Sequence, residues 1–164
     1  MTNVRTLALL IMFLSLSVIG SMLKLPATLG SIALDSAPAL VAAALLGPKR
    51  GAFIAALGHL FSALFAAFPL GVFHWLVALE MGLLIYGFGL LFQKGWRKSA
   101  YLFFFVGNAF VAPLPFAFFI GTAFVIALLP SLAIGTAANI AVSFVVIPML
   151  LKANIHYTGK MPHA

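Results

Sequence analysis

Six long apolar runs divide the sequence, and short segments rich in proline, glycine or basic residues separate them. A helix needs about 20 apolar residues to cross the hydrocarbon core of a bilayer, and most of these runs approach that length. The pattern therefore predicts one all-α integral membrane domain over residues 1–164, with six transmembrane helices at 4–23, 32–46, 51–68, 72–92, 99–119 and 129–152.

The second run differs from the others because it is short. Asp35 and Ser36 are typical of a helix N-cap, and the helix that follows ends near Leu46 after about a dozen residues, roughly 18 Å. Irregular backbone is tolerated at membrane depth only where protein or a cavity surrounds it. We therefore expect the preceding segment, 24–34, to enter the protein together with this helix.

Prolines interrupt the last two runs. Pro113 and Pro115 should kink or break the fifth helix, because proline lacks the backbone N–H that a helix interior needs. We place an external turn between Gly121 and Leu129. The sixth helix then begins near Pro130, since proline is favoured in the first turn of a helix.

Composition and charge support a membrane location. With 65% hydrophobic and 7% charged residues and a mean hydropathy of +1.23, no soluble domain could bury this much apolar surface. The predicted topology places nearly all basic residues on the cytoplasmic side and only Lys24 outside, which is the expected asymmetry; the cytoplasmic ones are Arg5, Lys49, Arg50, Lys94, Arg97, Lys98, Lys152 and Lys160. Both termini are then cytoplasmic, in a bacterial plasma membrane. The basic residues do not share one face, which argues against nucleic-acid binding.

The stretch 35–80 contains the only two acidic residues of the chain, Asp35 and Glu80, together with His59 and His74. A carboxylate inside a bilayer is costly, so it is by default a candidate functional group. In the predicted topology these groups and two asparagines lie at mid-depth or in the outer half, which indicates a substrate pocket open to the exterior. The candidate substrate-binding residues are Asp35, His59, Ser62, His74, Trp75, Glu80, Asn108 and Asn139.

Each of these residues also has a purely structural interpretation. Asp35 can serve as a helix cap, the histidines and Glu80 can pair with each other, and the asparagines can join helices. Trp75 can stack on an aromatic ligand or anchor the chain at the membrane interface.

Several kinds of chemistry lack their sequence signals. There is no cysteine and no phosphate-binding G-x-x-x-x-G-K-[ST] loop, and no histidines have the spacing of a zinc motif. We assign no catalytic residue, metal or cofactor. Two alternatives stay open: a small intramembrane enzyme using Ser62, His59 and Glu80, and a pure assembly subunit.

The segment ALDSAPALVAAALLGPKRGAFIAALGHLFSAL (33–64) resembles the substrate-binding S components of energy-coupling factor vitamin transporters. An acidic-capped apolar helix, a leucine-rich LLGP turn and a Gly/Ala-rich helix carry the likeness, which extends over nearly the whole chain. Within that family, ALGHLFSALFAAFPLGVFHWLVALEMG (56–82) and GNAFVAPLPF (107–116) are most similar to the α-ribazole transporter subfamily.

The resemblance implies that this chain binds a vitamin or a vitamin precursor, with α-ribazole as the first candidate and riboflavin as the second. Separate partner subunits would supply the energy for transport. Those partners are a membrane scaffold subunit and two ATPases, which would use the ATP. It implies a gating loop, for which the candidate residues are Leu25, Pro26, Gly30 and Ser31. It also implies that the first helix docks to the scaffold through a face of small residues with an A-x-x-x-A-like pattern. Here Met12 stands four residues after Ala8, so this pattern is imperfect, and Ser17 and Ser21 are possible substitutes.

Overall fold

The computed structural model describes residues 4–23, 25–26 and 31–158 and is almost entirely helical. One short antiparallel strand pair interrupts the helices. The elements in chain order are α1 (Val4–Met22), β1 (Leu25–Pro26), β2 (Ser31–Ile32), α2 (Ser36–Leu46), α3 (Pro48–Phe65), α4 (Phe73–Gln93), α5 (Arg97–Val106), the π-helical turn η1 (Gly107–Val111), α6 (Leu114–Phe119) and α7 (Thr122–Thr158).

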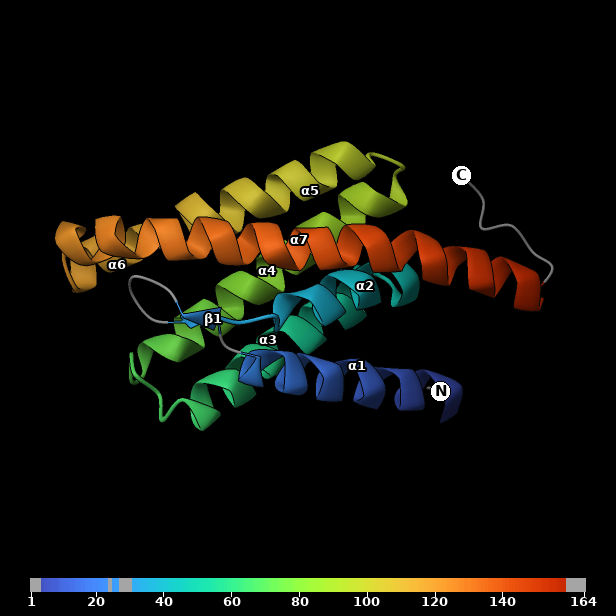
Figure 1. Ribbon diagram of the computed structural model, residues 1–164, viewed down its shortest axis with the longest axis horizontal. Coiled ribbons are helices and arrows are strands. Elements are labelled where there is room, and N and C mark those ends of the chain that lie inside the picture. Colours follow the sequence, from blue (N-terminus) through green and yellow to red (C-terminus); the bar gives the residue numbers. More distant parts are fainter. Residues whose placement is uncertain (1–3, 24, 27–30, 159–164) are drawn as a thin grey trace.

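The described helices run back and forth along the long axis of the molecule (Figure 1). The start of α1, the α2–α3 turn, the α4–α5 turn and the end of α7 lie at the right-hand end of this view. The β1–β2 pair, the α3–α4 turn and the α6–α7 turn lie toward the left. The basic residues of the α2–α3 and α4–α5 turns therefore share one end of the bundle. Which side of a membrane that end faces stays a prediction.

Four helical stretches are long and apolar enough to cross a membrane: Val4–Met22, Phe73–Gln93, Arg97–Phe119 and Thr122–Ala153. α2 is also apolar but has only 11 residues. These features confirm an all-α architecture and are compatible with an integral membrane protein. The number of spans stays a prediction.

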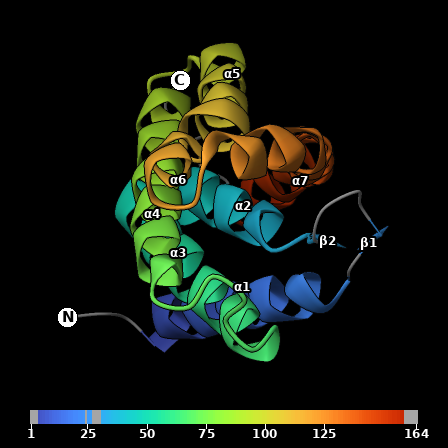
Figure 2. The ribbon, with the colours of Figure 1, turned by 90° about the vertical axis from the view of Figure 1, so that its left-hand side faces the viewer.

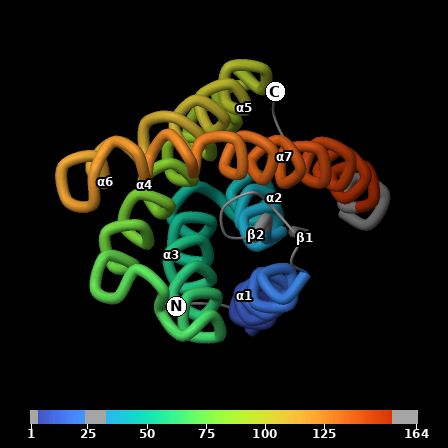
Figure 3. Tube along the Cα trace, turned by 60° about the vertical axis from the view of Figure 1, so that its left-hand side comes forward, coloured from blue at the N-terminus to red at the C-terminus, as the bar shows by residue number. Residues whose placement is uncertain are grey.

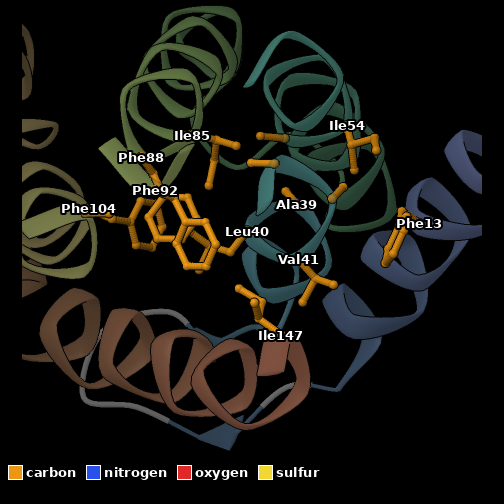
Figure 4. Packing of buried hydrophobic residues seen from close by; sticks show 14 of the residues in the cluster. Phe13, Ala39, Leu40, Val41, Ile54, Ile85, Phe88, Phe92, Phe104 and Ile147 are labelled. Atoms are coloured by element: carbon orange, nitrogen blue, oxygen red, sulfur yellow. The ribbon is translucent and has the colours of Figure 1, made fainter. Parts of the chain in front are cut away.

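The short helix α2 lies at the centre, between α1, α3, α4 and α7 (Figures 2 and 3). Its small side chains let the neighbouring helices approach closely, and Ala39, Leu40 and Ala42 have no exposed surface. Figure 4 shows Leu40 beside the rings of Phe88 and Phe92 in the apolar core. α2 is thus an internal helix rather than a lipid-facing span.

The segment before α2 is held against the end of α1. Gly20 accepts a hydrogen bond from the Leu34 backbone N–H (3.0 Å), and any side chain at Gly20 would overlap the Leu34 carbonyl. β2 also contacts α7. The end of this segment, from β2 to Leu34, therefore lies against α1 and α7.

The last helix begins earlier than the sequence suggested. The predicted turn between Gly121 and Leu129 is wrong, because α7 begins at Thr122 and Pro130 lies inside it. Ile120 and Gly121, the latter with φ of 121°, make the turn. The residues before Pro130, TAFVIALL, are all compatible with a helix, and α7 continues through the proline. Pro113 does break the preceding pass, between η1 and α6.

Candidate functional site

Asn139 of α7 caps the first turn of α2. Its Oδ1 accepts hydrogen bonds from the backbone N–H groups of Ser36 (3.1 Å) and Ala37 (2.7 Å). Its Nδ2 donates to the carbonyl oxygens of Ala33 (2.8 Å) and Gly135 (2.9 Å). Both donors and both acceptor positions of the amide are thus occupied by backbone. Asn139 joins helices and has no hydrogen-bonding capacity left for a substrate, which corrects its assignment to the substrate site.

Asp35 does not cap α2 through its side chain, although it occupies the N-cap position. Its backbone is helical (φ −80°, ψ −27°), whereas a capping residue normally has extended dihedral angles that turn its side chain back toward the helix. Its carboxylate instead accepts a hydrogen bond from the Ser36 hydroxyl at 3.2 Å. The predicted N-cap position is therefore confirmed, but Asn139 rather than the Asp35 side chain accepts the hydrogen bonds of the first N–H groups of α2.

Ser17 and Ser21 of α1 point into the bundle, with 1% and 2% of their surface exposed. The Ser17 hydroxyl donates to the carbonyl oxygen of Asp35, and the Ser21 hydroxyl donates to that of Val18. The proposed docking face is therefore corrected. These serines pack α1 inside the chain and offer no surface to a scaffold subunit.

His59 and His74 join α3 to α4 near the turn between them. His59 Nε2 lies 3.1 Å from His74 Nδ1, and the Leu70 backbone N–H donates to His74 Nε2 at 3.2 Å. The Phe68 ring packs edge-on against His74, with ring centroids 5.6 Å apart. This arrangement fixes a turn in which Ala67 and Phe68 both have positive φ, a costly conformation for residues other than glycine.

The hydrogen-bond network assigns the protons of the two rings. His74 Nε2 accepts from Leu70, so the proton of neutral His74 is on Nδ1 and is donated to His59 Nε2. His59 then carries its own proton on Nδ1. Ser62, the possible nucleophile, makes no hydrogen bond to His59 within the described residues, and the enzyme alternative stays a prediction.

Packing distances set the level of Glu80 in the bundle. α4 and the α5–α6 pass run antiparallel, and three pairs define their register: Gly87 with Phe103, Leu84 with Gly107, and Phe73 with Phe116. Glu80 lies one helical turn from Leu84, on the same face and toward Phe73. The register therefore places Glu80 opposite the π-helical turn η1.

The Glu80 side chain is half-buried. Its Oε2 is buried and makes no hydrogen bond within the described part of the chain. No ion pair to Glu80 is formed there either, and the flanking residues Leu79 and Met81 are apolar. A shielded carboxyl oxygen without a partner is costly, and it is most costly where water is scarce.

The π-helical turn presents Asn108 beside α7. The Ala112 N–H donates to the Gly107 carbonyl at 2.8 Å, and this wider turn ends at Val111, two residues before Pro113, which has no N–H to continue an α-helix. Asn108 Nδ2 donates to Thr136 Oγ1 at 2.7 Å, and Thr136 donates to the Leu132 carbonyl at 2.6 Å. Isolated π-helical turns are frequent at functional sites.

The structure does not join all the predicted substrate residues. Their hydrogen bonds form three separate groups, around Asn139, around the two histidines, and around Asn108, while Glu80 stands opposite the last. Trp75 is 65% exposed, so it does not lie among the buried polar groups, and its role in binding stays a prediction. Of the proposed gating residues, the backbone of Leu25, Pro26 and Ser31 forms the strand pair, and Gly30 lies outside the described residues.

Thr136, Phe116 and Phe119 were not among the candidate residues predicted from the sequence. Phe73 contacts both Phe116 and Phe119 of α6, with ring centroids 5.9 and 5.2 Å apart. For Thr136, the only signal in the sequence was a polar residue within an apolar run.

Comparison of the chain with protein-family models, with curated proteins and with solved structures gave no match.

Proposed function

We propose that the chain binds a small planar molecule at Glu80 and η1, as the substrate-binding membrane subunit of an ATP-driven importer. The observation that carries this proposal is the buried Glu80 Oε2, which has no hydrogen-bond partner in the described chain and lies opposite a π-helical turn. Buried polar atoms are normally paired, so an exception points to a group that acquires its partner on binding.

The chemistry of the site selects the kind of ligand. Glu80 accepts hydrogen bonds, so the ligand supplies O–H or N–H donors. Phe73, which contacts Phe116 and Phe119, lies about two helical turns from Glu80 toward the α3–α4 turn, and these rings suit a planar ligand. An aromatic base with a hydroxylated sugar or chain meets both requirements. α-Ribazole is our first candidate and riboflavin the second.

The transport role follows the sequence resemblance to S components of energy-coupling factor transporters. In such an importer a scaffold subunit and two ATPases, all separate chains, would supply the energy. The predicted topology, with basic turns inside, would open the site to the exterior of a bacterial plasma membrane.

The test is ligand binding by the purified chain in a neutral detergent. Mass spectrometry of the denatured protein detects a retained ligand, and calorimetric titration with a vitamin panel measures affinity. Glu80→Gln keeps the shape of the side chain and removes its charge, so affinity should fall about 10- to 100-fold, the effect of losing a hydrogen bond to a charged group. Trp75→Phe, on the outward surface, is the matched control and should bind like the unmodified chain. Failure of the whole panel to bind, or unchanged affinity in Glu80→Gln, would contradict the proposal.

A further inference from the structure

The turn between α4 and α5 concentrates positive charge on the surface. Residues 93–99 are all exposed, and three of them, Lys94, Arg97 and Lys98, are basic. Gly95, with φ of 81°, makes the turn. An open hollow of about 550 Å³ lies here, and it is lined by Gly95, Trp96, Arg97, Lys98 and Ser99.

These charges have no acidic counter-ion among the described residues. The only acidic residues are Asp35 and Glu80, and Glu80 lies 13 residues before the end of α4, about 20 Å along the helix. Aromatic rings orient two of the cations instead. Lys94 Nζ lies 5.8 Å from the Trp96 ring centroid, and the Arg97 guanidinium lies 5.4 Å from that of Phe92. The turn therefore presents oriented cations to an external anion.

Apolar side chains continue from the cations along both helices. Leu102 and Val106 follow Lys98 at intervals of four residues on one face of α5, and they are 63% and 43% exposed. On α4, Leu90 lies one turn before Lys94 and is 41% exposed. A ligand that contacts both regions has an anionic end and a long apolar end.

We propose that this turn binds an anionic phospholipid, with the headgroup phosphate in the hollow and an acyl chain along Leu102 and Val106. Arg97 and Lys98 contact the phosphate, since guanidinium and ammonium groups form strong charge-assisted hydrogen bonds to phosphate oxygens. Trp96 lies at the level of the headgroups, where tryptophan is enriched in membrane proteins. Soluble anions match only the hollow, whereas an anionic phospholipid also covers the apolar surface.

The neighbouring basic turn provides an internal control. Gly47 lies beside Gln93, so the α2–α3 turn shares this end of the bundle. Arg50 Nη1 donates to the Leu46 carbonyl at 3.1 Å and is thereby engaged at the end of α2. Lys49 is exposed, carries the same charge as Lys98 and does not line the hollow.

The experiment measures lipid binding to the full chain in a neutral detergent by native mass spectrometry. The probes are phosphatidylglycerol, phosphatidylcholine and inorganic phosphate, and the variants are Arg97→Gln with Lys98→Gln, Lys98→Gln alone, and Lys49→Gln. The unmodified chain should bind phosphatidylglycerol at least tenfold more tightly than phosphatidylcholine. The double variant should lose this preference, Lys98→Gln alone should lose it several-fold, and Lys49→Gln should retain it.

Three outcomes would overturn the proposal. Equal binding of the two lipids would show that the headgroup charge is not recognised. Competition by inorganic phosphate at the lipid's own concentration would assign the site to a soluble anion. If Lys49→Gln and Lys98→Gln lose the preference for phosphatidylglycerol equally, the lipid is attracted to the net charge of this end of the bundle and not to the hollow. If the double variant does not fold, Lys98→Gln, whose side chain makes no ring contact, decides between these outcomes.

Discussion

Two regions of the bundle place polar groups among apolar helices, and they satisfy those groups differently. At the start of α2, every donor and acceptor of the Asn139 amide is paired with backbone. Opposite η1, the Glu80 side chain is half-buried, and its shielded Oε2 has no partner in the described chain. Fully paired polar groups fix the arrangement of helices, whereas an unpaired one costs stability and calls for a functional reason. The first region is therefore structural, and the second is the better candidate for a binding site.

The largest expected effect is a loss of stability when Asn139, in the structural region, is replaced. Asn139→Ala removes four hydrogen bonds and leaves the first N–H groups of α2 without a cap. The free energy of unfolding should fall by about 2–4 kcal/mol, from the loss of a cap and of buried hydrogen bonds. Reversible unfolding in mixed micelles measures the change.

Asn139→Asp is the matched control for that variant. It keeps acceptor oxygens for Ser36 and Ala37 but donates nothing to Ala33 or Gly135. The oxygen that replaces Nδ2 then faces those two carbonyl oxygens in a buried position, so the loss of stability in this variant should be at least as large as that of Asn139→Ala. If Asn139→Ala unfolds like the unmodified chain, the structural role of this residue is wrong.

A medium effect is expected at the histidine pair. His74→Ala removes the bonds to both His59 and the Leu70 N–H, so it should destabilise the chain by about 1–2 kcal/mol. His59→Ala removes only one of those bonds and should cost less. Hydrogen exchange of the Leu70 amide should accelerate in His74→Ala but hardly at all in His59→Ala. Equal acceleration in the two variants would contradict the assigned network.

The smallest effect is expected at Ser17, whose hydroxyl binds the Asp35 carbonyl. Ser17→Ala should lower stability by about 1 kcal/mol, the value of one buried hydrogen bond. Ser15 lies on the same helix but is exposed, and Ser15→Ala should leave stability unchanged. Thermal unfolding of the two variants side by side measures the difference. If Ser15→Ala loses more stability than Ser17→Ala, the assignment of Ser17 to the buried face of α1 is wrong.

Much of the fold could be predicted because apolar runs and turn residues are local signals. The predicted helix at 72–92 corresponds to α4 at Phe73–Gln93, and the short second helix is found where it was expected. The start of α7 was misplaced, because the sequence does not distinguish a first-turn proline from one inside a helix. In a bundle, packing and neighbouring groups can compensate for the hydrogen bond that an internal proline removes.

The candidate site was harder to predict, because it depends on contacts between distant segments. Asn139 was recognised as polar at mid-depth, but its partner Ser36 is 103 residues away. The inward direction of Ser17 and Ser21 likewise depends on where α2 and α3 pack. Glu80 could be identified from the sequence because a lone carboxylate in an apolar run is conspicuous wherever it packs. The π-helical turn opposite it could not, since Pro113 predicts a break but not its form.

The most direct test of the central claim compares stability and binding in one variant, Glu80→Gln. If Glu80 is kept for a ligand at a cost in stability, the ligand-free variant should unfold with a free energy equal to that of the unmodified chain or about 1 kcal/mol higher. The same variant should lose the stabilisation that a bound vitamin gives. A variant that is clearly less stable without ligand, yet is stabilised by ligand as before, would show that Glu80 serves the fold and not the site.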